Sequence, residues 1–169
     1  NLEGQAKTMS EEFVLYEQTG AVVTLTLNNP DERNALSTQA QWDAIVDACD
    51  RIQADNSVKA VVLTGAGSAF CAGGNVKGMG ANRDKAKLAM SHDERVADLQ
   101  ERQRLLTGAL VAVRKPTIAA LPGPAVGAGL ALAMACDIRI AAESAFVSTG
   151  YLRVALSGDY GIAWLLTRL

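Results

Sequence analysis

A glycine-rich loop that directly follows an apolar strand is the feature that most constrains this chain. It lies between Lys59 and Val76, in KAVVLTGAGSAFCAGGNV. Ala60 to Leu63 is a short apolar run rich in valine, and Thr64 and Gly65 end it, which is typical of a buried strand that leads into a loop. Glycines let such a loop turn sharply and bring its main chain close to a ligand. The stretch predicts either a site lined by backbone or an ordinary strand-to-loop connection.

Two common nucleotide-binding motifs do not fit this loop. A dinucleotide fingerprint needs a third glycine three residues after the second, but Gly65 and Gly67 are followed by Phe70 at that position. A phosphate loop ends in Gly-Lys-Ser/Thr, and the sequence has no such tripeptide. Both motifs are excluded.

A second strand and glycine loop occur between Lys115 and Ala142. Thr117 to Leu121 is an apolar run of strand length, and the Pro-Gly-Pro that follows forces a turn. Gly127 and the glycine two residues later then open a helix of small residues that runs to Cys136. The start of a helix offers unpaired N–H groups and the positive end of a dipole. Two such loops could aim N–H donors at one carbonyl oxygen, which would make an oxyanion hole.

Composition predicts one compact α/β domain and excludes several kinds of partner. A chain of 169 residues with 49% hydrophobic content can bury one core. A net charge of -2 without a basic cluster excludes a nucleic-acid surface, and no apolar run approaches the ~18 residues of a membrane span. The three cysteines are unpaired in number and lack metal-type spacing. They favour a reducing compartment, and with no charged-then-apolar leader we expect a cytoplasmic protein. No metal or redox cofactor is expected.

The first half of the chain predicts a hairpin followed by a helix. Phe13 to Gln18 and Ala21 to Leu27 are rich in β-branched and aromatic residues, and Thr19-Gly20 joins them. Ser37 or Thr38 can cap the helix that follows. Its expected buried face consists of Trp42, Ile45, Val46, Cys49 and Ile52.

The second half predicts further helices and strands in alternation. Lys77 to Asp93 reads as a polar loop with short helical pieces, and Glu94 to Val113 as a helix whose apolar face includes Val96, Leu99, Leu106, Leu110 and Val113. Asp137 to Ile140 and Ala145 to Ser148 are expected strands. Short strands alternating with helices indicate a βαβ-type core.

Four motifs together resemble the crotonase, or enoyl-CoA hydratase/isomerase, superfamily. They are RNAL from Arg33, AFCAGGNV from Ala69, KPTIAALPGPAVGAGLALAMACDIRIA from Lys115, and the closing LTRL. The resemblance extends from about Phe13 to the last residue. It implies an α/β crotonase-like fold, a spiral of ββα units, of which residues 9–169 are the N-terminal core. Residues 1–8 are set aside as a tag remnant, and the C-terminal helices of the family are expected to lie beyond Leu169.

The same resemblance implies the site. The backbone N–H groups of Gly74 and Ala128 would form the oxyanion hole. The implied substrate contacts are Arg33, Ala35, Ala72, Gly74, Asn75, Val76, Gly127, Ala128 and Gly150. The substrate would be an acyl-CoA thioester, so that coenzyme A enters as part of the substrate and no separate cofactor is needed. Homotrimers, or hexamers built from them, are the implied assembly. The alternative for Arg33 is an ordinary solvated loop cation.

Departures from the hydratase pattern narrow the chemistry. Hydratases of the family carry two catalytic glutamates, and the matching positions here hold Ala131 and Gly150. Asp159, in LSGDYG, stands where isomerases and dehalogenases of the family place an acid. One carboxylate is enough to move a double bond, because the same group removes and returns the proton. The alternative for Asp159 is a structural cap at the start of a helix.

Three hypotheses follow from these residues. The first is an acyl-CoA isomerase that uses Asp159, the second a hydratase of fatty-acid β-oxidation, and the third an acyl-CoA-binding homologue without catalysis. A serine hydrolase is excluded, because there is no Gly-x-Ser-x-Gly elbow and Ser68 has only the single histidine, His92, as a base. Related dehalogenases use a histidine from this part of the fold, but His92 comes too early for that match and is expected to be a solvated loop residue.

Overall fold

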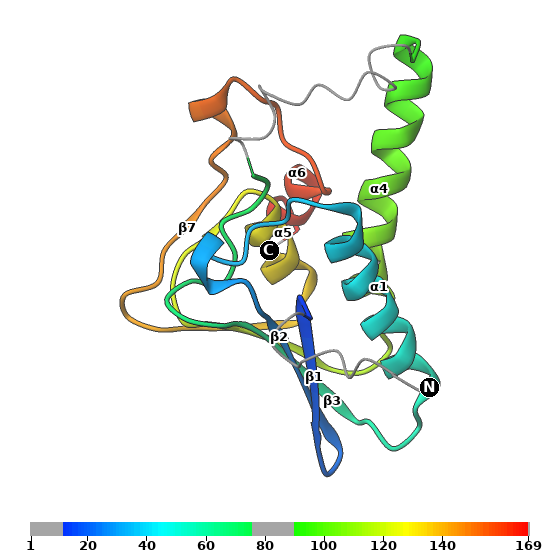
Figure 1. Ribbon diagram of the computed structural model, residues 1–169, viewed down its shortest axis with the longest axis vertical. Coiled ribbons are helices and arrows are strands. Elements are labelled where there is room, and N and C mark those ends of the chain that lie inside the picture. Colours follow the sequence, from blue (N-terminus) through cyan, green and yellow to red (C-terminus); the bar gives the residue numbers. More distant parts are fainter. Residues whose placement is uncertain (1–11, 76–89, 169) are drawn as a thin grey trace, which may run out of the picture.

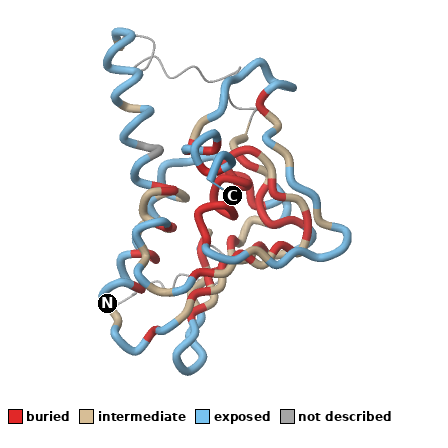
Figure 2. The backbone as a smooth tube through the Cα atoms, turned by 180° about the vertical axis from the view of Figure 1, so that it is seen from behind, coloured by how far each residue is buried: buried red, intermediate tan, exposed pale blue. Residues whose placement is uncertain are grey.

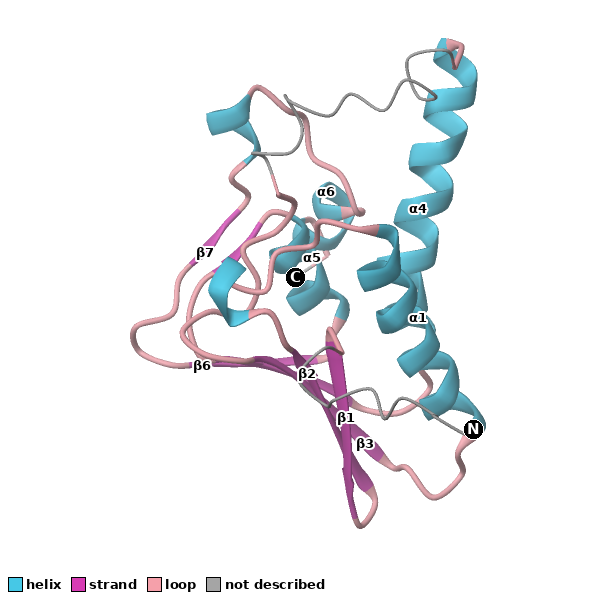
Figure 3. Cartoon of the chain, in the orientation of Figure 1, coloured by secondary structure: helices cyan, strands magenta, loops and turns pink. Residues whose placement is uncertain are grey.

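The computed structural model describes residues 12–75 and 90–168, in which strands and helices alternate along the chain. The main sheet has the strand order β1-β2-β3-β4-β6 (Figures 1 and 3). Its strands are β1 (Val14–Thr19), β2 (Val22–Leu27), β3 (Ala60–Gly65), β4 (Thr117–Leu121) and β6 (Ile138–Ala141). A second, two-stranded sheet pairs β5 (Ala125–Val126) with β7 (Val147–Ser148).

The predicted hairpin and parallel core are both confirmed. β1 and β2 pair antiparallel, while β2, β3, β4 and β6 pair parallel to one another. The hairpin turn lies one residue later than predicted, at Gly20 and Ala21, where Gly20 has a φ of 59° that glycine adopts without strain. β4 begins and ends at the residues that the sequence predicted, Thr117 and Leu121.

Helix α1 (Gln39–Ala54) begins at a cap that the sequence predicted. The Thr38 hydroxyl accepts a hydrogen bond from the Gln41 N–H at 3.3 Å, and the Gln41 side chain accepts one from the Thr38 N–H at 3.0 Å. These reciprocal bonds satisfy two N–H groups that a helix start leaves unpaired. Of the predicted buried face, Ile45, Cys49 and Ile52 are buried, whereas Trp42 and Val46 are only partly covered.

Helix α4 (His92–Ala112) differs from its prediction at its start. It begins two residues before Glu94, because Ser91 caps it and Glu94 completes a capping box. The loop predicted over Lys77 to Asp93 is therefore wrong at its end, and its residues 77–89 lie outside the described part. His92 is the first residue of the helix instead of a loop residue, although it is exposed as expected.

The apolar face predicted for α4 is buried only in the second half of the helix. Leu106 and Leu110 are buried, but Val96 and Leu99 are 40% and 48% exposed. Figure 1 shows why: α4 runs beside α1 and then continues past it. Helical periodicity identifies an apolar face, but it does not show how far along that face a partner extends.

Helix α5 (Ala128–Ala135) lies at the centre of the molecule and is buried over its whole length. Figure 2 shows the buried residues gathered around it and along the inner strands of the sheet. It contacts α4, β4, β5 and the short α6 (Ile162–Leu166). Gly129 lets the first glycine loop approach the helix closely, because a Cβ there would lie 2.2 Å from the Cys71 carbonyl oxygen.

The remaining described elements are two short 3₁₀ helices, η1 (Pro30–Glu32) and η2 (Tyr151–Val154). Among the described residues, no helix combines the length and apolar character needed to cross a membrane.

Candidate functional site

The carboxyl ends of four parallel strands bring the predicted site residues to one edge of the main sheet. The segments that follow β2, β3, β4 and β6 all leave the sheet at this edge, since the strands run in the same direction. Ligand sites of α/β proteins commonly form at such an edge. These segments contain the RNAL motif, the first glycine loop, the second glycine loop and Asp159, respectively.

Backbone hydrogen bonds join three of these segments. The Ala72 N–H donates to the Arg33 carbonyl at 2.9 Å, and the Leu36 N–H donates to the Gly73 carbonyl at 2.8 Å. The Val126 N–H in turn donates to the Cys71 carbonyl at 3.0 Å. Segments distant in sequence therefore form one continuous main-chain surface, with the first glycine loop in the middle.

Gly73 allows the two glycine loops to touch. Its φ is 84°, and a Cβ at this position would lie 2.5 Å from the Val126 carbonyl oxygen and 3.3 Å from the Ala128 nitrogen. Gly74 and Ala128, the two predicted oxyanion donors, are thus brought to neighbouring positions. Among the described residues, neither Gly74 nor Ala128 uses its N–H in a hydrogen bond. Free, adjacent donors are what an oxyanion hole requires.

The N–H of Ala128 also lies at the start of α5, an eight-residue helix without exposed residues. Gly127 precedes it with φ 54° and ψ -121°, so the chain turns abruptly into the helix. The positive end of the helix dipole is aimed at this point. Because α5 is buried, solvent screens that dipole less than it would screen a surface helix.

Asn34 braces the first glycine loop, a role that sequence reasoning missed. Its side chain is fully buried, and its Nδ2 donates to the carbonyls of Ala66, Ala69 and Phe70 at 2.9, 2.9 and 3.2 Å. Its Oδ1 accepts from the Asn29 N–H at 2.9 Å. The residue stands inside the RNAL motif between two residues assigned to substrate contacts, yet only the fold reveals which carbonyls it meets.

Asp159 is partly buried and bonded to one neighbouring phenol. The Tyr151 hydroxyl donates a hydrogen bond to its Oδ1 at 2.5 Å. Burial raises the pKa of Asp159 above its ordinary value, and the bond from Tyr151 opposes that rise without cancelling it. Burial, together with the neighbouring carboxyl, also raises the pKa of the Tyr151 phenol. An acid with a raised pKa is better matched to proton transfer near neutral pH.

Tyr151 connects this acid to the second glycine loop. A Cβ at Gly127 would lie 3.9 Å from Cε1 of the Tyr151 ring, so the ring packs on the residue before Ala128. The predicted contact Gly150 is the N-cap residue that precedes η2, with φ 71°, and a Cβ there would lie 2.9 Å from Cγ1 of Val126. Tyr151 thus lies between Asp159, to which its hydroxyl donates, and Gly127, the residue before the predicted donor Ala128.

The other predicted residues divide into those near the glycine loops and those elsewhere. Ala35 is buried, Ala72 and Asn75 are partly covered, and Arg33 is exposed on its loop. Val76 lies outside the described residues. Ala131 is fully buried inside α5, and His92 stands exposed at the start of α4. Their roles in binding substrate stay predictions.

The thiol within the first glycine loop, Cys71, is buried and hydrogen-bonded. Cys71 is fully buried, and its Sγ donates a hydrogen bond to the Asn34 carbonyl at 3.0 Å. Burial raises the pKa of this thiol to about 12, so it stays protonated at neutral pH. In the described part of the chain, no cluster of His, Cys, Asp or Glu could hold a metal ion.

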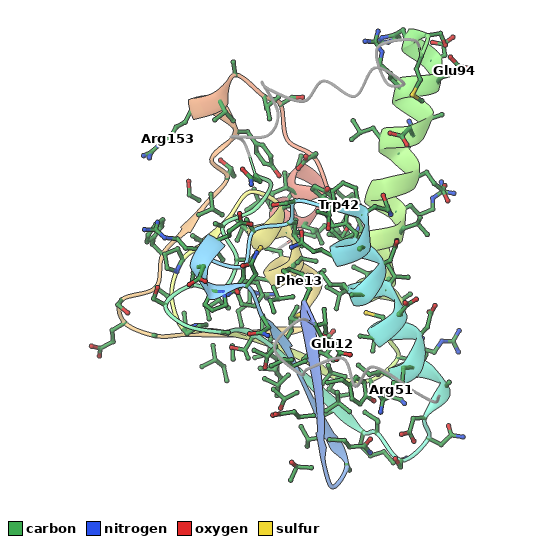
Figure 4. The ribbon with its side chains drawn as sticks, in the orientation of Figure 1. Glu12, Phe13, Trp42, Arg51, Glu94 and Arg153 are labelled. Carbon is green, nitrogen blue, oxygen red and sulfur yellow. The ribbon has the colours of Figure 1, made fainter. Side chains whose placement is uncertain are left out.

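A separate groove of about 690 Å³ lies between β1 and α1. Figure 4 labels three of the residues that line it, Glu12, Phe13 and Arg51. None of the predicted site residues lines this groove. The glycine loops, and not this groove, carry the chemistry expected from the sequence.

Comparison with known proteins identifies the family of this chain. The family model for enoyl-CoA hydratase/isomerase matches residues 17–169. The chain belongs to the enoyl-CoA hydratase/isomerase family. The crotonase resemblance is thereby confirmed, and so is the mixed α/β fold with its parallel sheet.

Individual relatives carry names for different reactions. A protein of Mycobacterium tuberculosis (strain H37Rv) named "Probable enoyl-CoA hydratase EchA14" is 40% identical over 87% of this chain and 54% of its own length. The 4-chlorobenzoyl coenzyme A dehalogenase-2 of Arthrobacter sp. is 30% identical over 95% of this chain and 56% of its own length. The crystal structure of an enoyl-CoA hydratase from Polaromonas sp. JS666 superposes with a TM-score of 0.78 at 34% identity, covering 92% of this chain and 58% of that one. The chain spans little more than half the length of these relatives.

Proposed function

We propose that the protein is an acyl-CoA-processing enzyme that stabilises a thioester enolate, with Asp159 as its acid and base and a double-bond shift as its reaction. The observation that carries the proposal is the partly buried Asp159 carboxyl, with its raised pKa, which Tyr151 connects to Gly127, the residue before Ala128. The N–H groups of Gly74 and Ala128, which make no hydrogen bond to the described residues, support it. Membership of a family that includes isomerases supports it.

The proposed reaction needs one base and one oxyanion hole. The Asp159 carboxylate removes a proton from C2 of a 3-enoyl thioester, and the electrons move to the thioester oxygen. The N–H groups of Gly74 and Ala128 hold the negative charge of the resulting dienolate. Asp159 then returns the proton to C4, which leaves a 2-enoyl thioester and restores the carboxylate. Arg33, Ala35, Ala72 and Asn75 are proposed contacts of the coenzyme A part of the substrate.

Hydration is the second candidate, because the names of relatives such as EchA14 favour it. Adding water to an enoyl thioester normally uses two carboxylates, one to hold the water and one to manage the proton. The two positions that match those glutamates hold Ala131, which is fully buried in the core, and Gly150. A hydratase would therefore need Asp159 and a further, unassigned group. A non-catalytic binder would not need the buried acid.

The test compares the complete polypeptide with its Asp159→Asn variant on a 2-enoyl-CoA and a 3-enoyl-CoA separately. Chromatography and mass spectrometry follow the products. We expect a mass-neutral interconversion of the two isomers that the variant loses. The matched control is Asp50→Asn, an exposed acid of α1, which should retain the wild-type rate. A product heavier by one water would refute the isomerase proposal, and binding without any product would favour the non-catalytic alternative.

We also propose that the complete polypeptide forms homotrimers. Apolar side chains of β6, β7 and the segment between them, namely Ile138, Ile140, Phe146 and Val147, are each more than half exposed in the described structure. Large apolar side chains exposed in this way are commonly covered by another protein surface. Light scattering of the complete polypeptide after size-exclusion chromatography tests this, and a monomeric mass at micromolar concentration would refute it.

A further inference from the structure

Tyr151 holds an unusual position for a polar side chain. It begins η2 and is 91% buried, with a relative exposure of 9%, and its hydroxyl donates to the Asp159 Oδ1 at 2.5 Å. The pairing could not be read from the sequence, because an eight-residue separation within an irregular segment predicts no contact. The neighbouring Arg153 points away from the body of the molecule in Figure 4, so η2 turns only its first residue inward.

The Tyr151 ring is fixed between two glycines. One edge lies 3.9 Å from the position that a Cβ would take at Gly127, and the other edge lies 3.9 Å from that position at Gly158. The first glycine precedes the proposed donor Ala128, and the second precedes Asp159. The ring therefore sets the spacing between the two parts of the proposed site.

The segment that carries Asp159 is fastened at its other side. Tyr160 has a φ of 50°, its carbonyl accepts from the Thr107 hydroxyl at 3.2 Å, and its ring meets Trp42 edge-on at 6.2 Å. The Asp159 carbonyl accepts from the Ile162 N–H at 3.0 Å. These contacts hold the segment around Asp159 to α4, α1 and α6 and thereby restrict the position of the Asp159 carboxyl group.

We propose that Tyr151 is a positioning residue, whose hydroxyl engages Oδ1 of Asp159 and leaves Oδ2 as the oxygen that exchanges the proton with the substrate. This inference rests on the proposed catalytic role of Asp159. The phenol stabilises the carboxylate form by donating a hydrogen bond to it, and it thereby opposes the effect of burial. Because the phenol itself keeps its proton throughout the ordinary pH range, it acts as a fixed donor.

The test is Tyr151→Phe, which keeps the ring between Gly127 and Gly158 and removes only the hydroxyl. A base is active when deprotonated, so activity rises with pH through its pKa. Loss of the donor should raise the Asp159 pKa and move the rising limb of the kcat/KM profile by about one pH unit toward higher pH. At pH values below that limb, we expect kcat/KM of Tyr151→Phe to be about tenfold lower than that of the wild type. The control is Tyr16→Phe, whose hydroxyl has no partner among the described residues and which should leave the profile unmoved.

A purely structural role would lower the rate at every pH without moving the limb, and this result would overturn the proposal. Titration of the Asp159 carboxyl by NMR, in protein labelled with ¹³C at aspartate, measures the same pKa without turnover. If Asp159→Asn keeps full activity, the proposed function fails, and the titration still shows whether Tyr151 sets the protonation of Asp159. If Asp159→Asn is inactive but neither the limb nor the titration moves in Tyr151→Phe, only the positioning role is refuted.

Discussion

Replacing Asn34 by aspartate should destabilise the protein strongly and in a pH-dependent way. The change keeps the size of the side chain and its tolerance of the left-handed backbone at φ 58°. It exchanges the Nδ2 donor for an oxygen that faces the carbonyls of Ala66, Ala69 and Phe70. Three hydrogen bonds are lost, and the introduced carboxyl group meets only acceptors there.

The magnitude follows from these contacts. Each net hydrogen bond contributes about 1 kcal/mol, and each buried acceptor left without a donor costs about 1–3 kcal/mol. The bonds to Ala69 and Phe70 are fully buried and that to Ala66 is partly so. We therefore expect a loss of about 3–6 kcal/mol, against a total of about 5–15 kcal/mol for a typical domain.

The pH dependence has a definite sign. Burial among carbonyls raises the folded-state pKa of the introduced carboxyl group above its unfolded value of ~3.9. The protonated form can donate one hydrogen bond, so the variant is least impaired at acidic pH. Its stability then falls as the pH rises through the folded-state pKa. Asn34→Ala loses the same donors without gaining a charge, so its deficit should not depend on pH in this way.

Urea unfolding of the complete polypeptide, followed by circular dichroism between pH 4 and pH 8, measures the effect. The control is Asn56→Asp, which introduces the same charge at an exposed position. A deficit for Asn34→Asp below about 1 kcal/mol would refute the bracing role, because a single net hydrogen bond accounts for that much. A deficit that shrinks as the pH rises would refute the assignment of Nδ2 to the three carbonyls.

Three further predictions concern the site and the fold. Gly73→Ala should lower kcat at least a hundredfold, because its Cβ would lie 2.5 Å from the Val126 carbonyl oxygen. The control Gly20→Ala has open space around its Cβ, so it should lose only about 1–2 kcal/mol of unfolding free energy and no activity. Thr38→Ala should cost about 1 kcal/mol in urea unfolding through loss of the α1 cap, and an unchanged midpoint would contradict the capping box. Because the pKa of Asp159 is raised in the folded state, its carboxyl group destabilises the fold increasingly as the pH rises. Asp159→Asn should therefore have a higher Tm than wild type at pH 8, and this difference in Tm should disappear toward pH 4. An equal Tm difference at both pH values would contradict this.

Local signals explain why much of the fold could be predicted from the sequence. The strand Thr117–Leu121 ends at a Pro-Gly-Pro turn, and α1 is capped by Thr38, so a few neighbouring residues determine where each element begins or ends. The start of α4 was missed although its signal is equally local, because Ser91 and Glu94 form a capping box that was not recognised. β5 has two residues and exists because β7 pairs with it, which no local pattern predicts.

The candidate site divides in the same way. The glycine loops and Asp159 could be proposed from the sequence because motifs mark them. The residues that hold these segments in place could not be identified in this way. Asn34 acts on carbonyls 32 to 36 residues away, and Tyr151 reaches Asp159 through a loop without periodic structure. Residues that support a site are chosen by tertiary contact, so their sequence positions alone do not identify them.

The site's construction from main chain explains how one fold can serve different acyl-CoA reactions. The proposed donors at Gly74 and Ala128 are amides, positioned by backbone bonds among three segments and by Asn34, so they do not depend on which acid stands nearby. The proposed acid, by contrast, is a side chain, which one substitution can add or remove. In the proposed function, enolate stabilisation is the constant part of the chemistry, and the number and place of the acids would decide where the proton or water goes. With Asp159 as the proposed acid, proton return to carbon is the reaction that we propose for this arrangement.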